Sequence, residues 1–299
     1  MLGRITNQQL LLSSQRSLQA SRAQLAQLQE RVSTGKAVSR PSDDPSATAS
    51  ILRVRGEQRA VQQYATNITD GLAWLATVDR ALSGSGNLLR QARDLTVQGA
   101  NSGAMTPAAR EAIATQLEGV RADLLQQANT TYLGRSVFAG TSDAGVAFDT
   151  SDPAAPYSYT GTAGASVARR INDTESILVD ADGAAAFGTG GGSLFALIDD
   201  IVADLRAGAD VWGRITELDT HRDRMSTQHA LVGARYARME QAQETNLSQS
   251  TALETQRSGI EDVDPAKAII DLQAQELTYK TALAVTARAL QPTLLDYLS

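Results

Sequence analysis

Histidine and cysteine, which bind zinc and similar metals and often act in catalysis, are nearly missing from this sequence. It has no cysteine, which excludes disulfides and thiolate metal sites, and its two histidines are His221 and His229. They lie eight residues apart and are not framed by the Glu-x-x-His pattern of a zinc protease. We interpret both as solvated polar positions on a helix and expect no metal site.

Two further features could suggest chemistry, and each has a structural explanation. The adjacent carboxylates of Asp43 and Asp44 precede Pro45, and an Asp-Pro pair is typical of a helix start, with Asp44 as N-cap and Pro45 as the first helical residue. The glycine run at 188–192 lacks the Lys-Ser or Lys-Thr and the preceding strand of a phosphate-binding loop. We therefore expect no catalytic residues, no cofactor and no enzymatic activity.

The same cap-then-proline signal marks two more helix starts, at Thr106-Pro107 and at Asp264-Pro265. Between such boundaries, apolar residues recur at helical spacing. The expected helices cover about 7–32, 47–95, 107–131, 194–207, 211–262 and the C-terminal stretch from 264. Trp74 and Trp212 are expected to pack within these helices.

Composition favours long helices over a globular fold. The chain is 42% hydrophobic but only 4% aromatic, and Ala, Leu and Gln are abundant. By contrast, 140–193 is rich in Gly, Ala, Asp, Ser and Thr, with short alternating pieces at 157–160 and 177–179. The expected fold is mainly α, with long antiparallel helical rods in a coiled-coil bundle and a small β-rich insert that is least able to carry a core alone.

Three domains are expected from these boundaries. Residues 1–40 with 264–299 form a terminal helical domain for assembly, 41–139 with 194–263 form the rods, and 140–193 form the insert. In the terminal domain, apolar residues recur at spacings of three, four or seven on both helices and cover more than one side of the C-terminal one. We expect them to form an assembly interface: Leu11, Leu18, Leu25, Leu28, Val32, Ile269, Leu272, Leu283, Leu290, Leu294, Leu295 and Leu298.

The charge and hydropathy of the sequence argue against nucleic acid and membranes as partners. The net charge is -6 and no sustained basic run occurs, so we expect no nucleic-acid partner. No apolar stretch approaches the length of a membrane span, and Ser13 to Arg16 interrupt the only N-terminal run that resembles a signal peptide. We expect no membrane insertion and no Sec export.

Four motifs in order resemble the flagellin family. They are RPSDDPSA at 40–47, GRSVFAG at 134–140, VGARYARME at 232–240, and the closing stretch from DVDPAKAIID at 262–271 to LQPTLLDYL at 290–298. The resemblance covers roughly the first 140 and last 100 residues and leaves the insert unmatched. Within the family, the C-terminal end and the short insert are similar to the branch that joins the flagellar hook to the filament.

The resemblance implies an extracellular structural subunit of the bacterial flagellum. Its terminal helices would form an inner tube in a homo-oligomeric axial layer, with a hook-associated protein and flagellin as neighbours and the insert facing outward. It further implies unfolded export by the flagellar type III route, with a cytosolic chaperone on the C-terminal helix. A filament flagellin, or a secreted coiled-coil adhesin or effector acting through its insert, are the alternatives.

Overall fold

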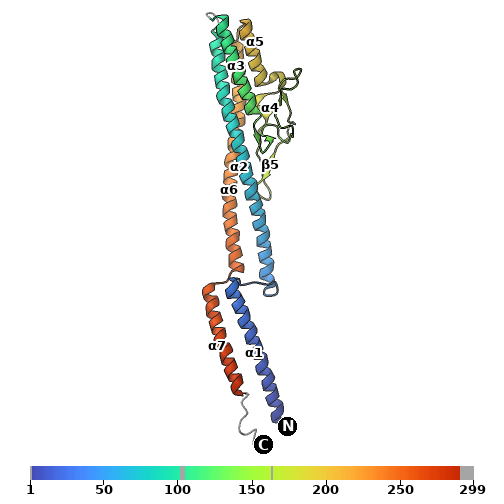
Figure 1. Ribbon diagram of the computed structural model, residues 1–299, viewed down its shortest axis with the longest axis vertical. Coiled ribbons are helices and arrows are strands. Elements are labelled where there is room, and N and C mark those ends of the chain that lie inside the picture. The colour runs from blue at the N-terminus through green and yellow to red at the C-terminus, as the bar shows by residue number, and fades with distance from the viewer. Residues whose placement is uncertain (1, 102–104, 163, 290–299) are drawn as a thin grey trace. The chain divides into compact units, whose positions relative to one another are not determined.

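The computed structural model describes residues 2–101, 105–162 and 164–289, and for residues 2–8, 10, 11 and 289 it describes the backbone alone. Long helices dominate it (Figure 1). They are α1 (Leu2–Thr34), α2 (Pro45–Ala100), α3 (Pro107–Ala128), α5 (Leu194–Ala207), α6 (Trp212–Glu261) and α7 (Pro265–Ala289), with a short α4 (Gly183–Phe187) and a 3-10 turn, η2 (Gly190–Gly192). The mainly α fold expected from the sequence is confirmed.

The chain divides into two compact units, and each contains segments from both halves of the sequence. One unit holds residues 1–60 and 250–299, and the other holds residues 61–249. Helices α2 and α6 contribute to both units. The three-part division expected from the sequence stays a prediction.

In the unit of residues 61–249, α2 and α6 run antiparallel and are joined by polar as well as apolar contacts. Arg93 Nε lies 2.9 Å from Asp219 Oδ1, and the amide of Asn246 donates to the carbonyl of Val61 at 3.0 Å. Helix α3 packs on α5. The inner face of α2 is a heptad series of fully buried side chains: Ile68, Leu75, Leu82 and Leu89.

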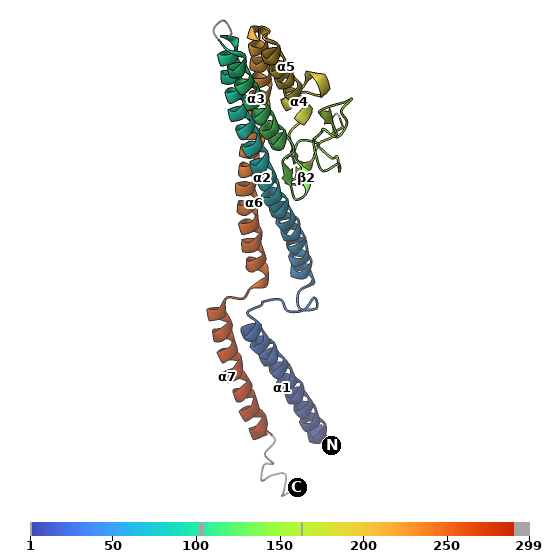
Figure 2. The same cartoon turned by 45° about the horizontal axis from the view of Figure 1, so that its top comes forward.

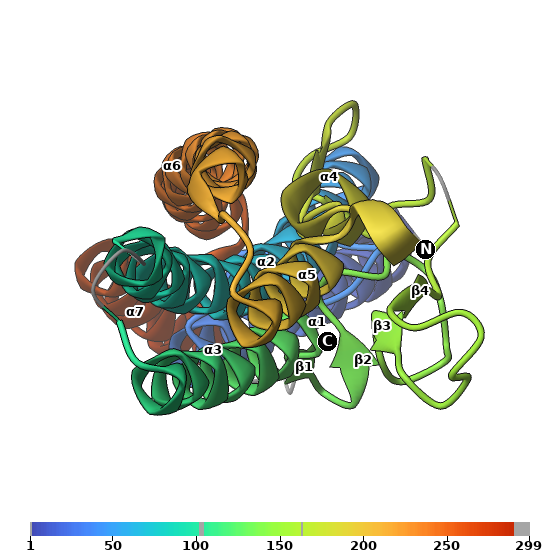
Figure 3. The same ribbon diagram turned by 90° about the horizontal axis from the view of Figure 1, so that it is seen from above.

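Loops and short antiparallel strand pairs form the insert and the segment that leads into it from α3 (Figure 3). The pairs are β1 (Thr131–Tyr132) with β2 (Arg135–Ser136), β3 (Phe148–Asp149) with β4 (Ser158–Tyr159), and β5 (Ala168–Arg170) with β6 (Ser176–Leu178). The four phenylalanines of the chain gather here: the ring of Phe148 lies 5.1 Å from that of Phe195 on α5 and 5.8 Å from that of Phe187, and the ring of Phe138 also contacts Phe187. The insert therefore shares its core with α5.

Two expectations about single side chains are wrong. Trp74 is buried, but Trp212 is 56% exposed at the first residue of α6. His221 is buried on the inner face of α6, where burial lowers the pKa of its imidazole, whereas His229 is partly exposed and its Nε2 lies 2.7 Å from Asp79 Oδ1. A helix that faces a partner along its length buries some polar positions that periodicity alone assigns to solvent.

Candidate assembly interface

The two terminal helices, α1 and α7, pack against each other as an antiparallel pair (Figures 1 and 2). The pairing brings together segments about 250 residues apart, as shown by the side-chain amide of Gln275, which donates to the carbonyl of Ser21 at 3.3 Å and to Gln24 Oε1 at 3.2 Å. Ala268 of α7 is buried.

The residues expected to form the assembly interface divide into two groups. On α1, Leu18, Leu25, Leu28 and Val32 are partly buried, and Leu272 of α7 is too. Ile269 and Leu283 remain exposed. The side chain of Leu11, together with Leu290, Leu294, Leu295 and Leu298, lies outside the described residues.

Helix α7 carries a second apolar line that its pairing with α1 does not cover. Ile270, Leu277 and Val285 are 64%, 64% and 67% exposed. They follow one another at spacings of seven and eight residues, so they lie along one side of the helix. Together with Ile269 and Leu283 they leave α7 with apolar surface that only another molecule or another segment can cover.

Two short linkers, 35–44 before α2 and 262–264 before α7, each end in an aspartate that is followed by a proline at the start of the helix. Helix α2 begins at Pro45, and Asp44 Oδ1 accepts from the amide of Ala47 at 2.9 Å. Helix α7 begins at Pro265, and Asp264 Oδ1 accepts from the amide of Ala266 at 2.9 Å. The carboxylates satisfy N–H groups that have no partner within the helix, so each linker ends at a fixed residue.

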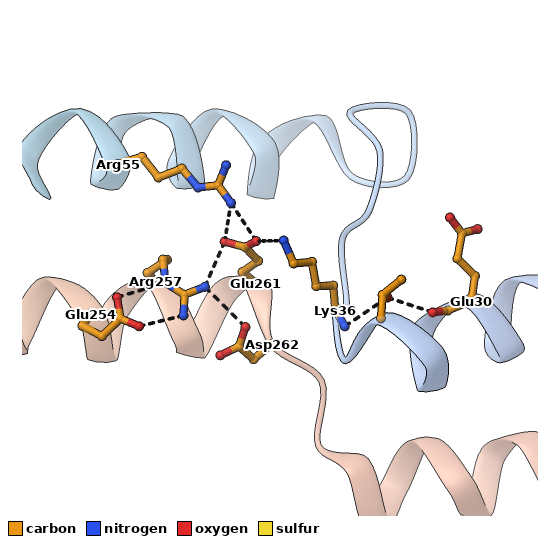
Figure 4. A network of polar contacts seen from close by, with 8 residues as sticks. Glu30, Lys36, Arg55, Glu254, Arg257, Glu261 and Asp262 are labelled. Atoms are coloured by element: carbon orange, nitrogen blue, oxygen red, sulfur yellow. Dashed lines mark hydrogen bonds and ion pairs between the residues drawn. The ribbon is translucent and has the colours of Figure 1, made fainter. Parts of the chain in front are cut away.

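Between these helix starts, the two linkers are held together by one buried carboxylate (Figure 4). The side chain of Glu261 is 3% exposed and binds three cations. Lys36 Nζ lies 2.7 Å from Oε1, Arg55 Nη2 lies 2.7 Å and 2.9 Å from the two oxygens, and Arg257 Nη1 lies 3.1 Å from Oε2. We call these four residues the Glu261 cluster.

Backbone hydrogen bonds near the cluster also join the two linkers. The amide of Ala37 donates to the carbonyl of Glu261 at 2.7 Å, and the amide of Val263 donates to the carbonyl of Gly35 at 3.0 Å. Gly35 has a φ of 68°, which a glycine adopts without strain, and this turn ends α1. The segment that leaves α1 and the segment that enters α7 are therefore bonded to each other at the point where the helix pair begins.

The surrounding cations determine the charge state of the cluster. The hydrogen bond from Lys36, with those from Arg257 and Arg55, lowers the pKa of the Glu261 carboxyl to about 2, although burial acts in the opposite direction. Glu261 is therefore ionised at neutral pH and compensates several positive charges. Removal of one member of the Glu261 cluster should lower the stability of the folded chain, because a buried charge is then left without part of its compensation.

Sequence reasoning missed the Glu261 cluster. Glu261 and Arg55 are 206 residues apart, and neither stands in a recognisable motif. The available signal was indirect: Lys36 and Glu261 each lie a few residues before an Asp-Pro helix start, so both flank a linker. Nothing in the local pattern shows that the two linkers pair.

The matched sequence families agree with this architecture. The pattern described as the bacterial flagellin N-terminal helical region matches residues 5–143, and the bacterial flagellin C-terminal helical region matches residues 215–298. This chain belongs to the bacterial flagellin family. The resemblance noted in the motifs is thereby confirmed.

Relatives within the family include two kinds of flagellar protein. Flagellin of Bacillus subtilis (strain 168) is 26% identical over 275 residues, covering 88% of each chain. Flagellar hook-associated protein 3 of Salmonella typhimurium (strain LT2) is 31% identical over 147 residues, which is 49% of this chain and 46% of that protein. This flagellin-family chain is thus similar to both.

Solved structures show the same fold. Flagellar hook-associated protein 3 from Legionella pneumophila superposes with a TM-score of 0.62 at 13% identity, covering 70% of this chain and 99% of that one. FlgL of Bacillus cereus gives a TM-score of 0.59 at 20% identity, covering 69% and 99%. The flagellin-family rod with a small insert is shared despite low identity.

Family membership settles the general class of this protein. It is a structural, non-enzymatic component of the bacterial flagellum that assembles with other flagellar proteins. Within the described residues, no three acidic or histidine side chains gather in a way that could hold a metal ion. Among the described helices, none is both long enough and apolar enough to cross a membrane.

Replacement of Glu261 by Gln tests whether the cluster stabilises the unit that contains the terminal helices. The amide keeps the shape but removes the charge, so we expect a loss of about 2 kcal/mol in the free energy of unfolding, since Lys36 and Arg55 are half-exposed and regain water. Urea unfolding and limited proteolysis at the linkers measure it. Glu240→Gln, at an exposed glutamate without an ion pair among the described residues, is the matched control. Equal stability of both variants contradicts the role of the cluster.

The lowered pKa of Glu261 predicts a dependence of stability on pH. Because the folded-state pKa of about 2 lies below the ordinary value of 4.5, the carboxylate stabilises the folded chain fully above pH 4.5. That stabilisation is lost as pH falls from 4.5 toward 2. The difference in unfolding free energy between the wild type and Glu261→Gln should shrink over this range, and a constant difference argues against the ionised cluster.

Proposed function

We propose that the chain is a structural subunit that joins the flagellar hook to the filament and polymerises through its terminal helices. The observation that carries this proposal is the second apolar line of α7: Ile270, Leu277 and Val285 are exposed although α7 already packs on α1. Each of these side chains contributes about 1.5 to 3 kcal/mol when fully buried. A polymer in which neighbouring copies cover this line supplies that burial.

The junction role is favoured over a filament role by the fold comparison and the size of the insert. The hook-associated protein 3 structure from Legionella pneumophila is covered over 99% of its length by 70% of this chain. The insert spans only about 54 residues, 140–193, and its aromatic side chains serve the core. A filament flagellin is the second candidate, because the Bacillus subtilis flagellin aligns over 88% of both chains.

The remaining parts of the proposal concern partners and export. A subunit at the junction has a hook-associated protein on one side and flagellin on the other, with copies of itself in the same layer. Export unfolded through the flagellar type III route, with a cytosolic chaperone on the C-terminal helix, fits the apolar surface of α7, because an exposed line of this kind invites aggregation before assembly.

Deletion of the insert would not distinguish an adhesin from a flagellar subunit. Phe148 and Phe187 from the insert are fully buried against Phe195 of α5. Removal of residues 141–193 would therefore empty the core of the larger unit and abolish every function together. Point variants on the surface separate the alternatives better.

Leu277→Gln tests the second apolar line of α7. The substitution removes exposed apolar surface, so the isolated chain should keep its thermal midpoint, while the fraction retained on flagella, relative to that released into the medium, should fall about tenfold. Leu178→Gln, at a partly exposed leucine of the insert, is the control and should be retained normally. Normal retention of Leu277→Gln argues against assembly through α7.

Location distinguishes the junction from the filament. We expect a fluorescent label on this chain to form one point between hook and filament in each flagellum, and loss of the chain to leave hooks without filaments while flagellin is released into the medium. Light microscopy of labelled cells and electron microscopy of the deletion strain measure this. A label spread along the filament establishes the filament role instead.

A further inference from the structure

The turn between β1 and β2 holds a leucine in a conformation that is unfavourable for it. Leu133 and Gly134, the two residues of this hairpin loop, have φ values of 49° and 78°. Turns with two positive φ values strongly favour Asn-Gly, because a bulky side chain is strained there. Leu133 is also 81% exposed, so no burial within the chain offsets the strain.

The position of this turn does not depend on the Leu133 side chain. The neighbouring Tyr132 anchors the hairpin on α2: its ring lies 5.3 Å from the ring of Trp74, and its hydroxyl donates to Asp70 Oδ1 at 3.2 Å. Asn or Gly at 133 would keep these contacts and relieve the strain. The packing of the described residues therefore gives no reason for a leucine at this position.

An unpaired cation accompanies the exposed leucine. Arg135 follows the turn, is exposed, and forms no ion pair with any residue that the structure describes. The hairpin end, Leu133 to Arg135, thus presents an apolar side chain and a positive charge within three residues. A partner that fits it offers apolar surface beside negative charge.

Helix α6 of the same chain provides a surface of this chemistry. Glu240, Glu244 and Leu247 follow at i, i+4 and i+7, so they share one face, and all three are exposed. Neither glutamate forms an ion pair within the described part of the chain. We call these three residues the α6 acidic face.

The hairpin end and the α6 acidic face do not meet within one chain. Met239 of α6 lies against Gly71, beside the Asp70 that binds the hairpin, and Leu247 lies eight residues, about 12 Å, farther along the helix. Leu247 stays 67% exposed. The two surfaces are complementary in charge and apolar character, and the side chains of Leu133 and Leu247 are both largely exposed to solvent.

We infer that the hairpin end of one copy docks on the α6 acidic face of a second copy. The inference rests on the proposed function, since it names a lateral contact of the assembled layer. It joins two different surfaces, so it is heterologous and propagates from copy to copy into a ring or a helix. The strain at Leu133 is then offset by burial in the assembly.

Leu133→Asn separates a role in assembly from a role in folding. Asparagine suits the turn, so the thermal midpoint of the isolated chain should stay the same or rise, while retention on flagella falls about tenfold or more. Val146→Asn, at another partly exposed apolar residue of the insert, is the control and should be retained normally. Normal retention of Leu133→Asn overturns the inference.

Charge exchange tests the pairing itself. Arg135→Glu alone, or Glu240→Arg with Glu244→Arg, should lower retention about threefold or more through like-charge repulsion, and combining all three substitutions should restore it. Combined losses without restoration mean that the hairpin end and the α6 acidic face contact different partners, and this outcome also overturns the inference.

Because the chain has no cysteine, a disulfide can report the contact directly. In flagella isolated from cells carrying Leu133→Cys with Leu247→Cys, oxidation should give a ladder of multimers on a non-reducing gel, and Leu178→Cys with Leu247→Cys should not. A band of monomer alone overturns the inference. If the wild-type chain is absent from the flagellum, the proposed function fails; if it is present and only the ladder is missing, the docking contact fails alone.

Discussion

The buried carboxylate of Glu261 is the interaction on which the arrangement of the terminal helices depends. Its three cations come from the linker after α1, from α2 and from α6 itself, so one side chain links α6 to α2 and to the end of α1. The hydrogen bonds between the two linkers act on the same place. A subunit that binds neighbours through α1 and α7 needs these helices to begin at defined residues, and the cluster with the two Asp-Pro starts defines them.

The terminal helix pair, α1 with α7, and the rod helices, α2 with α6, differ in how much of their apolar surface is buried. The heptad series of α2 from Ile68 to Leu89 is fully buried within its unit, whereas α7 keeps Ile270, Leu277 and Val285 exposed after pairing with α1. A monomer gains nothing from an exposed apolar line, since its burial free energy is realised only when another surface covers it. The buried core of the rods is therefore complete in one chain, whereas the terminal pair keeps an apolar line that only another surface can cover.

The helical part of the fold could be predicted because its signals are local. Apolar periodicity and the cap-proline pairs at Thr106, Asp44 and Asp264 place the helices within a few residues of their observed bounds. The Glu261 cluster and the burial of His221 could not be predicted, because both depend on which residues of distant segments face each other. The exposed Trp212 is the first residue of α6 and lies beside the apolar stripe rather than on it, since Val211 and Ile215 on either side are buried.

The strain at Leu133 and the exposure of α7 share one physical explanation. Each is unfavourable in an isolated chain, the first through backbone conformation and the second through contact of apolar surface with water. Neither is required by the packing around it, because Tyr132 fixes the hairpin and α7 already packs on α1 without this apolar line. Features that cost stability in the monomer, and that a single substitution would remove, are expected where a neighbouring molecule supplies the compensating contact. In the proposed assembly, contacts between copies would stabilise both features.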